Sequence, residues 1–131
     1  MEFLKLYLIA FVVFLVIDIL WLSVFAKKFY EKHLGYLMTK TPKYLAAALF
    51  YLVFIAGLVY FVIMPAVDAG EVTKAILSGL LFGFVTYATY DLTNLATVKD
   101  WPITITIVDL IWGSVLTTTI SVATFYISSI F

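Results

Sequence analysis

Residues 3–26 read FLKLYLIAFVVFLVIDILWLSVFA, a run whose only charged side chains are Lys5 and Asp18. A helix that crosses the hydrocarbon core of a bilayer needs roughly 20 predominantly apolar residues. The run is therefore long enough to cross a membrane as one helix. It is also longer than the apolar core of a signal peptide, and it has neither a basic leader nor an Ala-x-Ala-like exit, so we expect it to be retained as a span.

The composition extends this expectation to the whole chain. Of its 131 residues, 65% are hydrophobic and 12% are charged, and the mean hydropathy is +1.14. A soluble domain is roughly half apolar and about a quarter charged. This chain has too few polar side chains to cover a water-facing surface. We therefore expect an integral membrane protein, with the lipid bilayer as its first partner.

Further apolar runs follow, and the prolines Pro42, Pro65 and Pro102 lie between the runs rather than inside them. Because proline removes a backbone hydrogen bond from a helix, we expect each one to mark a loop. The runs are continuous and do not alternate as the strands of a membrane barrel do. The predicted fold is an all-α bundle of four transmembrane helices in a single domain, residues 1–131, with spans at about 3–26, 44–64, 74–97 and 103–130.

Lysines are unevenly distributed over the connections. The first connection, 27–43, holds five Lys and the third holds Lys99, whereas the N-terminus and the second connection hold one each. The positive-inside rule then predicts that the first and third connections are cytoplasmic and that both termini lie outside. Trp101 stands near a span end and is interpreted as an interface anchor.

The first connection also has a helical pattern. Apolar residues recur on one side, opposite the lysines: Phe29, Tyr30, His33, Leu34, Leu37 and Met38. This pattern predicts a short interfacial helix between the first two spans.

Carboxyl groups interrupt the apolar runs at Asp18 in the first span, Asp91 in the third and Asp109 in the fourth. Each costs about 2.5 to 3.5 kcal/mol near the centre of a membrane helix. Counted from the expected cytoplasmic boundaries at 1.5 Å per residue, they lie roughly 12 to 14 Å deep, which predicts one common layer.

This carboxyl layer has no counter-ion at its own depth, because Lys5 and Lys74 stand at the far ends of their spans. Neighbouring carboxyl groups in hydrocarbon hold a proton or share a cation. We therefore expect the layer to bind a proton, a cation or a small cationic ligand. Lysines at the cytoplasmic ends of the spans, bending inward, are an alternative source of positive charge.

Asp18 and Asp109 occur in near copies of one pattern, IDILWLSV at residues 17–24 and VDLIWGSV at residues 108–115. Asp and the Trp three residues later share a helix face, so the indole N–H of Trp21 or Trp112 could donate to a carboxyl group on a neighbouring helix. The two helices are expected to run antiparallel, which suggests a local pseudo-twofold pairing of the first and fourth spans. The pattern is too short to indicate a full inverted repeat.

Polar stripes mark the third and fourth spans. In the third span, Tyr87, Tyr90, Asp91 and Asn94 form one face, which Gly79 and Gly83 continue as a Gly-x-x-x-Gly pattern. The stripe in the fourth span consists of Asp109, Gly113, Thr117, Ser121, Thr124 and Ser128. Such stripes are usually helix-packing seams, and the alternative is a wet path to the outside. The candidate ligand- or proton-binding residues are Asp18, Trp21, Tyr87, Tyr90, Asp91, Asn94, Asp109 and Trp112.

Several classes of function lack support. The net charge is zero and Arg is absent, so a nucleic-acid partner is not expected. Cys is absent, which excludes thiolate catalysis and disulfides, and the only His, His33, lies outside the spans. Aspartates on separate helices carry no metal signature, and no Ser stands in a nucleophile-elbow pattern. We therefore assign no catalytic residue and no metal site, and the cofactor stays unknown.

The chain resembles domain-of-unknown-function family 2177, small bacterial four-span integral membrane proteins, over nearly its whole length. The resemblance is carried by DILWL at residues 18–22, FY at 29–30, HLG at 33–35, FY at 50–51, YATYDLTNLAT at 87–97, WP at 101–102, VD at 108–109 and WG at 112–113. It implies a multi-pass protein of a bacterial inner membrane. It brings no established activity.

Three hypotheses about function follow. The first is a protein that binds or transports a proton, a cation or a small cationic ligand at the carboxyl layer, with a homodimer as one way to enclose a path. The second is a structural or accessory subunit in which the Asp, Trp and Tyr layer only fixes helix packing. The third, ranked last, is a membrane enzyme acting on a lipid or isoprenoid with Asp91 as acid or base, which requires a pocket open to lipid.

Overall fold

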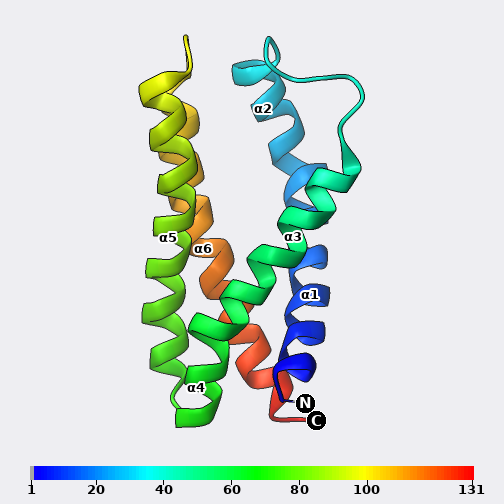
Figure 1. Ribbon diagram of the computed structural model, residues 1–131, viewed down its shortest axis with the longest axis vertical. Coiled ribbons are helices and arrows are strands. Elements are labelled where there is room, and N and C mark those ends of the chain that lie inside the picture. The colour runs from blue at the N-terminus through cyan, green and yellow to red at the C-terminus, as the bar shows by residue number, and fades with distance from the viewer. Residues whose placement is uncertain (1) are drawn as a thin grey trace.

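The computed structural model describes residues 2–131, and within that range it is helical with no strand. The elements are α1 (Glu2–Trp21), η1 (Leu22–Ala26), α2 (Lys27–Leu34), α3 (Tyr44–Leu58), η2 (Val59–Ile63), α4 (Met64–Ala69), α5 (Val72–Thr97) and α6 (Ile103–Ser128). The segments α1, η1 and α2 form one continuous helix, as do α3, η2 and α4 (Figure 1). The four resulting helices are each long and apolar enough to cross a membrane, which confirms the predicted all-α membrane bundle.

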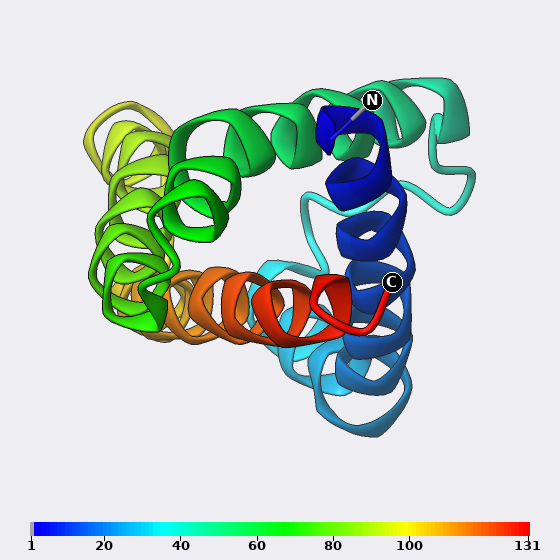
Figure 2. The same cartoon turned by 90° about the horizontal axis from the view of Figure 1, so that it is seen from below.

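The long helices alternate in direction along the chain (Figure 1). Both termini lie at one end with α4, whereas α2 and the connections 35–43 and 98–102 lie at the other. Viewed from the end, the helices form a ring in the order α1, α3, α5, α6 (Figure 2). The two lysine-bearing connections therefore share one end of the bundle, as the predicted orientation requires. Which end faces the cytoplasm stays a prediction.

Residues of the first connection are helical as expected, in α2, but the expectation of a separate interfacial helix is wrong, because α2 continues α1 through η1 in one helix of 33 residues. The segment η1 is a π-helical turn, in which the Lys27 N–H donates to the Leu22 carbonyl. A π turn holds more residues than an α turn and so rotates the helix face beyond it. Beyond this turn, Tyr30 faces α6, where it reaches Asp109.

The expectation that every proline marks a loop is wrong for Pro65. Pro42 lies in the first connection and Pro102 directly precedes α6, but Pro65 lies in the first turn of α4, inside the second long helix. It follows η2, a second π-helical turn. A proline is tolerated where the adjoining turn already departs from the α-helical hydrogen-bond pattern. The second long helix therefore continues to Ala69.

The closest helix contact is between α5 and α6. A Cβ atom on Gly83 would overlap the Thr117 hydroxyl and the Gly113 carbonyl. Across the same contact, Thr117 Oγ1 donates to the Gly79 carbonyl at 2.6 Å. Small residues let membrane helices approach until backbone and hydroxyl groups bond directly. At these residues the predicted stripes form a packing seam, the more usual of their two interpretations.

We expect Gly113→Ala to destabilise the bundle. The added Cβ atom would overlap the ring of Tyr87, and overpacking costs roughly 1–3 kcal/mol. Thermal unfolding in detergent micelles should show a clearly lower midpoint. Gly57→Ala is the control, because its Cβ atom would come no closer than 3.4 Å to Phe82. Equal midpoints for the two variants would contradict the tight seam.

Candidate functional site

Asp91 of α5 and Asp109 of α6 meet inside the bundle. The antiparallel helices are joined by the short connection 98–102, so residues equally far from it lie side by side. The two carboxyl groups are close enough to hydrogen-bond each other once one carries a proton. Asp91 is 0% exposed and neither of its oxygens has a hydrogen-bond partner, while Asp109 is 5% exposed. Among the described residues, no lysine acts on either carboxyl group.

Tyr30 of α2 holds one side of this pair. Its phenolic O–H donates to Asp109 Oδ1. This bond attaches the end of the first long helix to α6 and leaves the second oxygen of Asp109 available. Tyr30 donates no hydrogen bond to Asp91, so Asp109 has a hydrogen-bond donor and Asp91 has none.

Asp18 lies apart from the pair. Tyr51 of α3 donates to Asp18 Oδ2 at 2.9 Å. Tyr87 of α5 lies within electrostatic range of Asp18 and of both paired acids, and its ring packs against Gly113. The expected layer therefore divides into an Asp91–Asp109 pair and a separate Asp18–Tyr51 pair, with Tyr87 close to both.

Trp21 and Trp112 stack face to face, with ring centroids 4.0 Å apart and an interplanar angle of 10°. The expected pairing of the first and fourth spans around the Asp-x-x-Trp patterns is thus present. The expected donation from indole to carboxyl is not seen, because within residues 2–131 the two rings contact each other instead. Offset aromatic stacking contributes beyond the area it buries, and here it fixes α1 against α6 beside two of the acids.

Tyr90 and Asn94 lie farther along α5. Asn94 follows Tyr90 by one helical turn, and the Tyr90 ring meets Trp101 edge-on at 5.9 Å. The interpretation of Trp101 as an interface anchor is wrong, since its ring is buried and Nε1 donates to Thr106 Oγ1 at 3.1 Å. Trp101 therefore binds the α5–α6 connection to the start of α6. This contact helps to hold Asp91 and Asp109 at the same height along the two helices.

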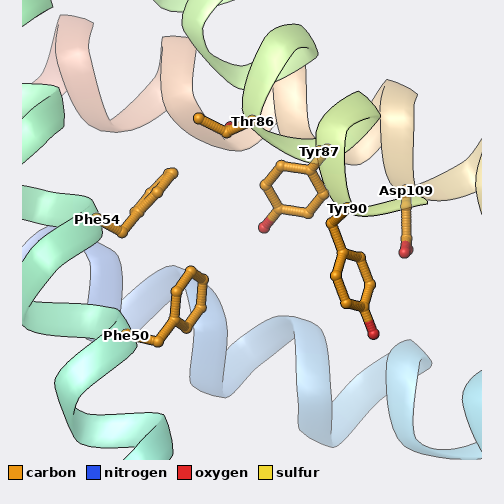
Figure 3. A pocket seen from close by; sticks show the side chains of 6 residues that line it. All are labelled: Phe50, Phe54, Thr86, Tyr87, Tyr90 and Asp109. Carbon is orange, nitrogen blue, oxygen red and sulfur yellow. The ribbon is translucent and has the colours of Figure 1, made fainter. Parts of the chain in front are cut away.

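A cavity of about 410 Å³ lies between α3 and α5 and also reaches Asp109 of α6. Its lining residues are Phe50, Phe54, Thr86, Tyr87, Tyr90 and Asp109. Figure 3 shows Phe50 and Phe54 on α3 across the cavity from Tyr87 and Tyr90 on α5. Phe50 is 53% and Tyr90 58% exposed, so the cavity is open at the surface of the bundle.

Sequence reasoning did not select Tyr30, Tyr51 or the two phenylalanines of the cavity. In the sequence, Tyr30 is only part of the helical pattern of the first connection, and Tyr51 stands in a span without an acid. Helical periodicity therefore predicted no hydrogen-bond partner for either tyrosine. The FY segments at residues 29–30 and 50–51, which belong to the family resemblance, were the only signal that pointed to these positions.

We expect Trp21 and Trp112 to be energetically coupled. Replacing each with Leu, singly and together, should reveal a coupling free energy of about 0.5–1.5 kcal/mol in denaturant unfolding in micelles. Trp21→Leu combined with Tyr126→Leu is the control, because Tyr126 is exposed near the end of α6. Additive effects for the Trp pair would show that the stack contributes nothing.

Comparison with known proteins confirms the family. The model of the family described as "Predicted membrane protein (DUF2177)" matches residues 3–126, from the first turn of α1 to the last turn of α6. No curated protein and no solved structure matches the chain significantly. Because the match extends over all four long helices, the chain belongs to the DUF2177 family of predicted membrane proteins.

Proposed function

We propose that this protein binds positive charge, as a proton, a cation or a small cationic ligand, at the Asp91–Asp109 pair. The observation that carries this proposal is the state of Asp91, which is fully buried with both oxygens unbonded. Buried polar groups are nearly always hydrogen-bonded, and an unbonded one is costly. A proton or cation at the pair would supply what the protein itself does not.

The contact between the two acids strengthens this argument. Two carboxylates side by side in a low-dielectric environment cannot both stay charged without a counter-ion. Tyr30 already donates to Asp109, so the missing positive group belongs beside Asp91. The pair therefore takes up at least one proton or cation.

A purely structural role accounts for only part of the site. The Tyr30–Asp109 bond, the Tyr51–Asp18 bond and the Trp stack all fix helix packing. Asp91 makes no such bond, and a neutral residue would serve packing better. An open cavity is what a membrane enzyme would also need, but the unbonded oxygens of Asp91 call for positive charge whether or not a reaction follows, so we favour binding over catalysis.

The same proposal includes an orientation. The lysine-bearing connections share one end of the bundle (Figure 1), which supports a cytoplasmic position for that end in a bacterial inner membrane. The cavity is formed within one chain, so binding does not depend on a second protomer. A homodimer would enclose a path across the membrane, but it would not be needed to form the binding site.

Thermal unfolding in liposomes tests the binding of charge. A ligand that binds only the native state raises its stability, by about 2.7 kcal/mol at a hundred times Kd. The unfolding midpoint of the unmodified protein should change with pH or with added K⁺ or tetraethylammonium, and Asp91→Asn should remove that response. Asp68→Asn, at an exposed acid of α4, should retain it. If Asp91→Asn responds as the unmodified protein does, the proposal is wrong.

A further inference from the structure

We infer that the charge taken up at the Asp91–Asp109 pair is an organic ammonium ion with apolar substituents, admitted from the lipid face through the cavity between α3 and α5. This inference rests on the proposed function and names its class of ligand. It depends on three features of the cavity: its aromatic walls, the acid in its lining and its opening at the bundle surface.

The walls are aromatic. Phe50 and Phe54 on one side and Tyr87 and Tyr90 on the other face the same space (Figure 3). The faces of aromatic rings attract cations, and cages of such rings are a recurring means of binding quaternary ammonium groups. Apolar substituents on the nitrogen would bury their surface against the same rings.

The lining also carries the opposite charge. Asp109 lines the cavity, and its neighbour Asp91 is 0% exposed with unbonded oxygens. One shared proton and one monovalent cation would neutralise the two carboxyl groups. A hard inorganic ion would instead need about six oxygen ligands to replace its water. The lining residues supply fewer side-chain oxygens, from the Asp109 carboxyl group and the hydroxyls of Thr86, Tyr87 and Tyr90.

The mouth opens on the part of the bundle that lipid covers. Phe50 and Tyr90 are each more than half exposed there, and the surrounding α3 surface is apolar, with Leu49 and Val53 exposed beside Phe50. A strongly hydrated ion would lose its water before it reached the acids. An alkylammonium ion is weakly hydrated, so it partitions to this face more readily. The volume of about 410 Å³ lies within the range of sites for small molecules.

Binding of labelled tetraethylammonium to the protein in phosphatidylglycerol vesicles tests the inference. We expect saturable binding that excess tetraethylmethane, its uncharged carbon isostere, does not displace. Phe50→Leu keeps an apolar side chain but removes a ring face, and it should weaken affinity about fivefold. Phe61→Leu is the matched control, because Phe61 is also more than half exposed but lies outside the cavity. Equal affinity for these two variants would overturn the aromatic recognition.

The outcomes separate this inference from the proposed function. If the unfolding midpoint responds to pH or K⁺ through Asp91 but tetraethylammonium does not bind, the ligand class is wrong and charge binding stands. If Asp91→Asn leaves every response unchanged, both fail. An ammonium group could also come from a lipid headgroup. Added phosphatidylcholine that competes with tetraethylammonium would assign the lipid, and its failure to compete would assign a free ammonium ion.

Discussion

The approach of α5 to α6 over glycine determines the position of every other group in the site. Because Gly83 has no Cβ atom, the Gly113 carbonyl and the Thr117 hydroxyl lie directly against the α5 backbone. Trp101 secures the connection between the two helices through its bond to Thr106. At this separation and register, Asp91 and Asp109 face each other within the seam. Hydrocarbon provides no solvent for them, so the rest of the bundle must accommodate an acid pair.

The other two long helices supply hydrogen bonds to Asp109 and to Asp18, but none to Asp91. The π turn η1 directs Tyr30 toward Asp109, and α3 directs Tyr51 toward Asp18. Each tyrosine satisfies one acid and attaches one helix, and the Trp21–Trp112 stack holds α1 beside α6. Asp91 alone receives no donor. The same set of contacts that builds the bundle thus leaves Asp91 unsatisfied, next to Asp109, which lines the aromatic cavity.

The apolar runs and the buried acids could be predicted from the sequence, because the cost of polar groups in lipid acts on each segment separately. The partners across helices could not. Counting residues from a membrane boundary gives the depth of Asp18 but not the direction in which it points, and that direction pairs it with Tyr51. The π turns change the rotation of a helix without any sequence signal of their own, which is why neither the Tyr30–Asp109 bond nor the helical position of Pro65 was predicted. The Asp-x-x-Trp patterns predicted which helices pair, but stacking of the rings replaced the expected N–H donation.

Asp18 and Asp109 each accept a hydrogen bond from a tyrosine and Asp91 accepts none, and this difference bears on why a membrane bundle would contain the three acids. Interhelical hydrogen bonds in membranes contribute about 0.6 kcal/mol on average, which offsets only part of the roughly 2.5 to 3.5 kcal/mol for inserting an acid. Asp18 and Asp109 recover that part through their tyrosines, whereas Asp91 recovers none from the protein. If packing were the only requirement, Asp91 would be the easiest of the three to replace by an apolar residue. Its position beside Asp109, which lines the cavity, is explained when a positively charged group from outside the chain completes the site.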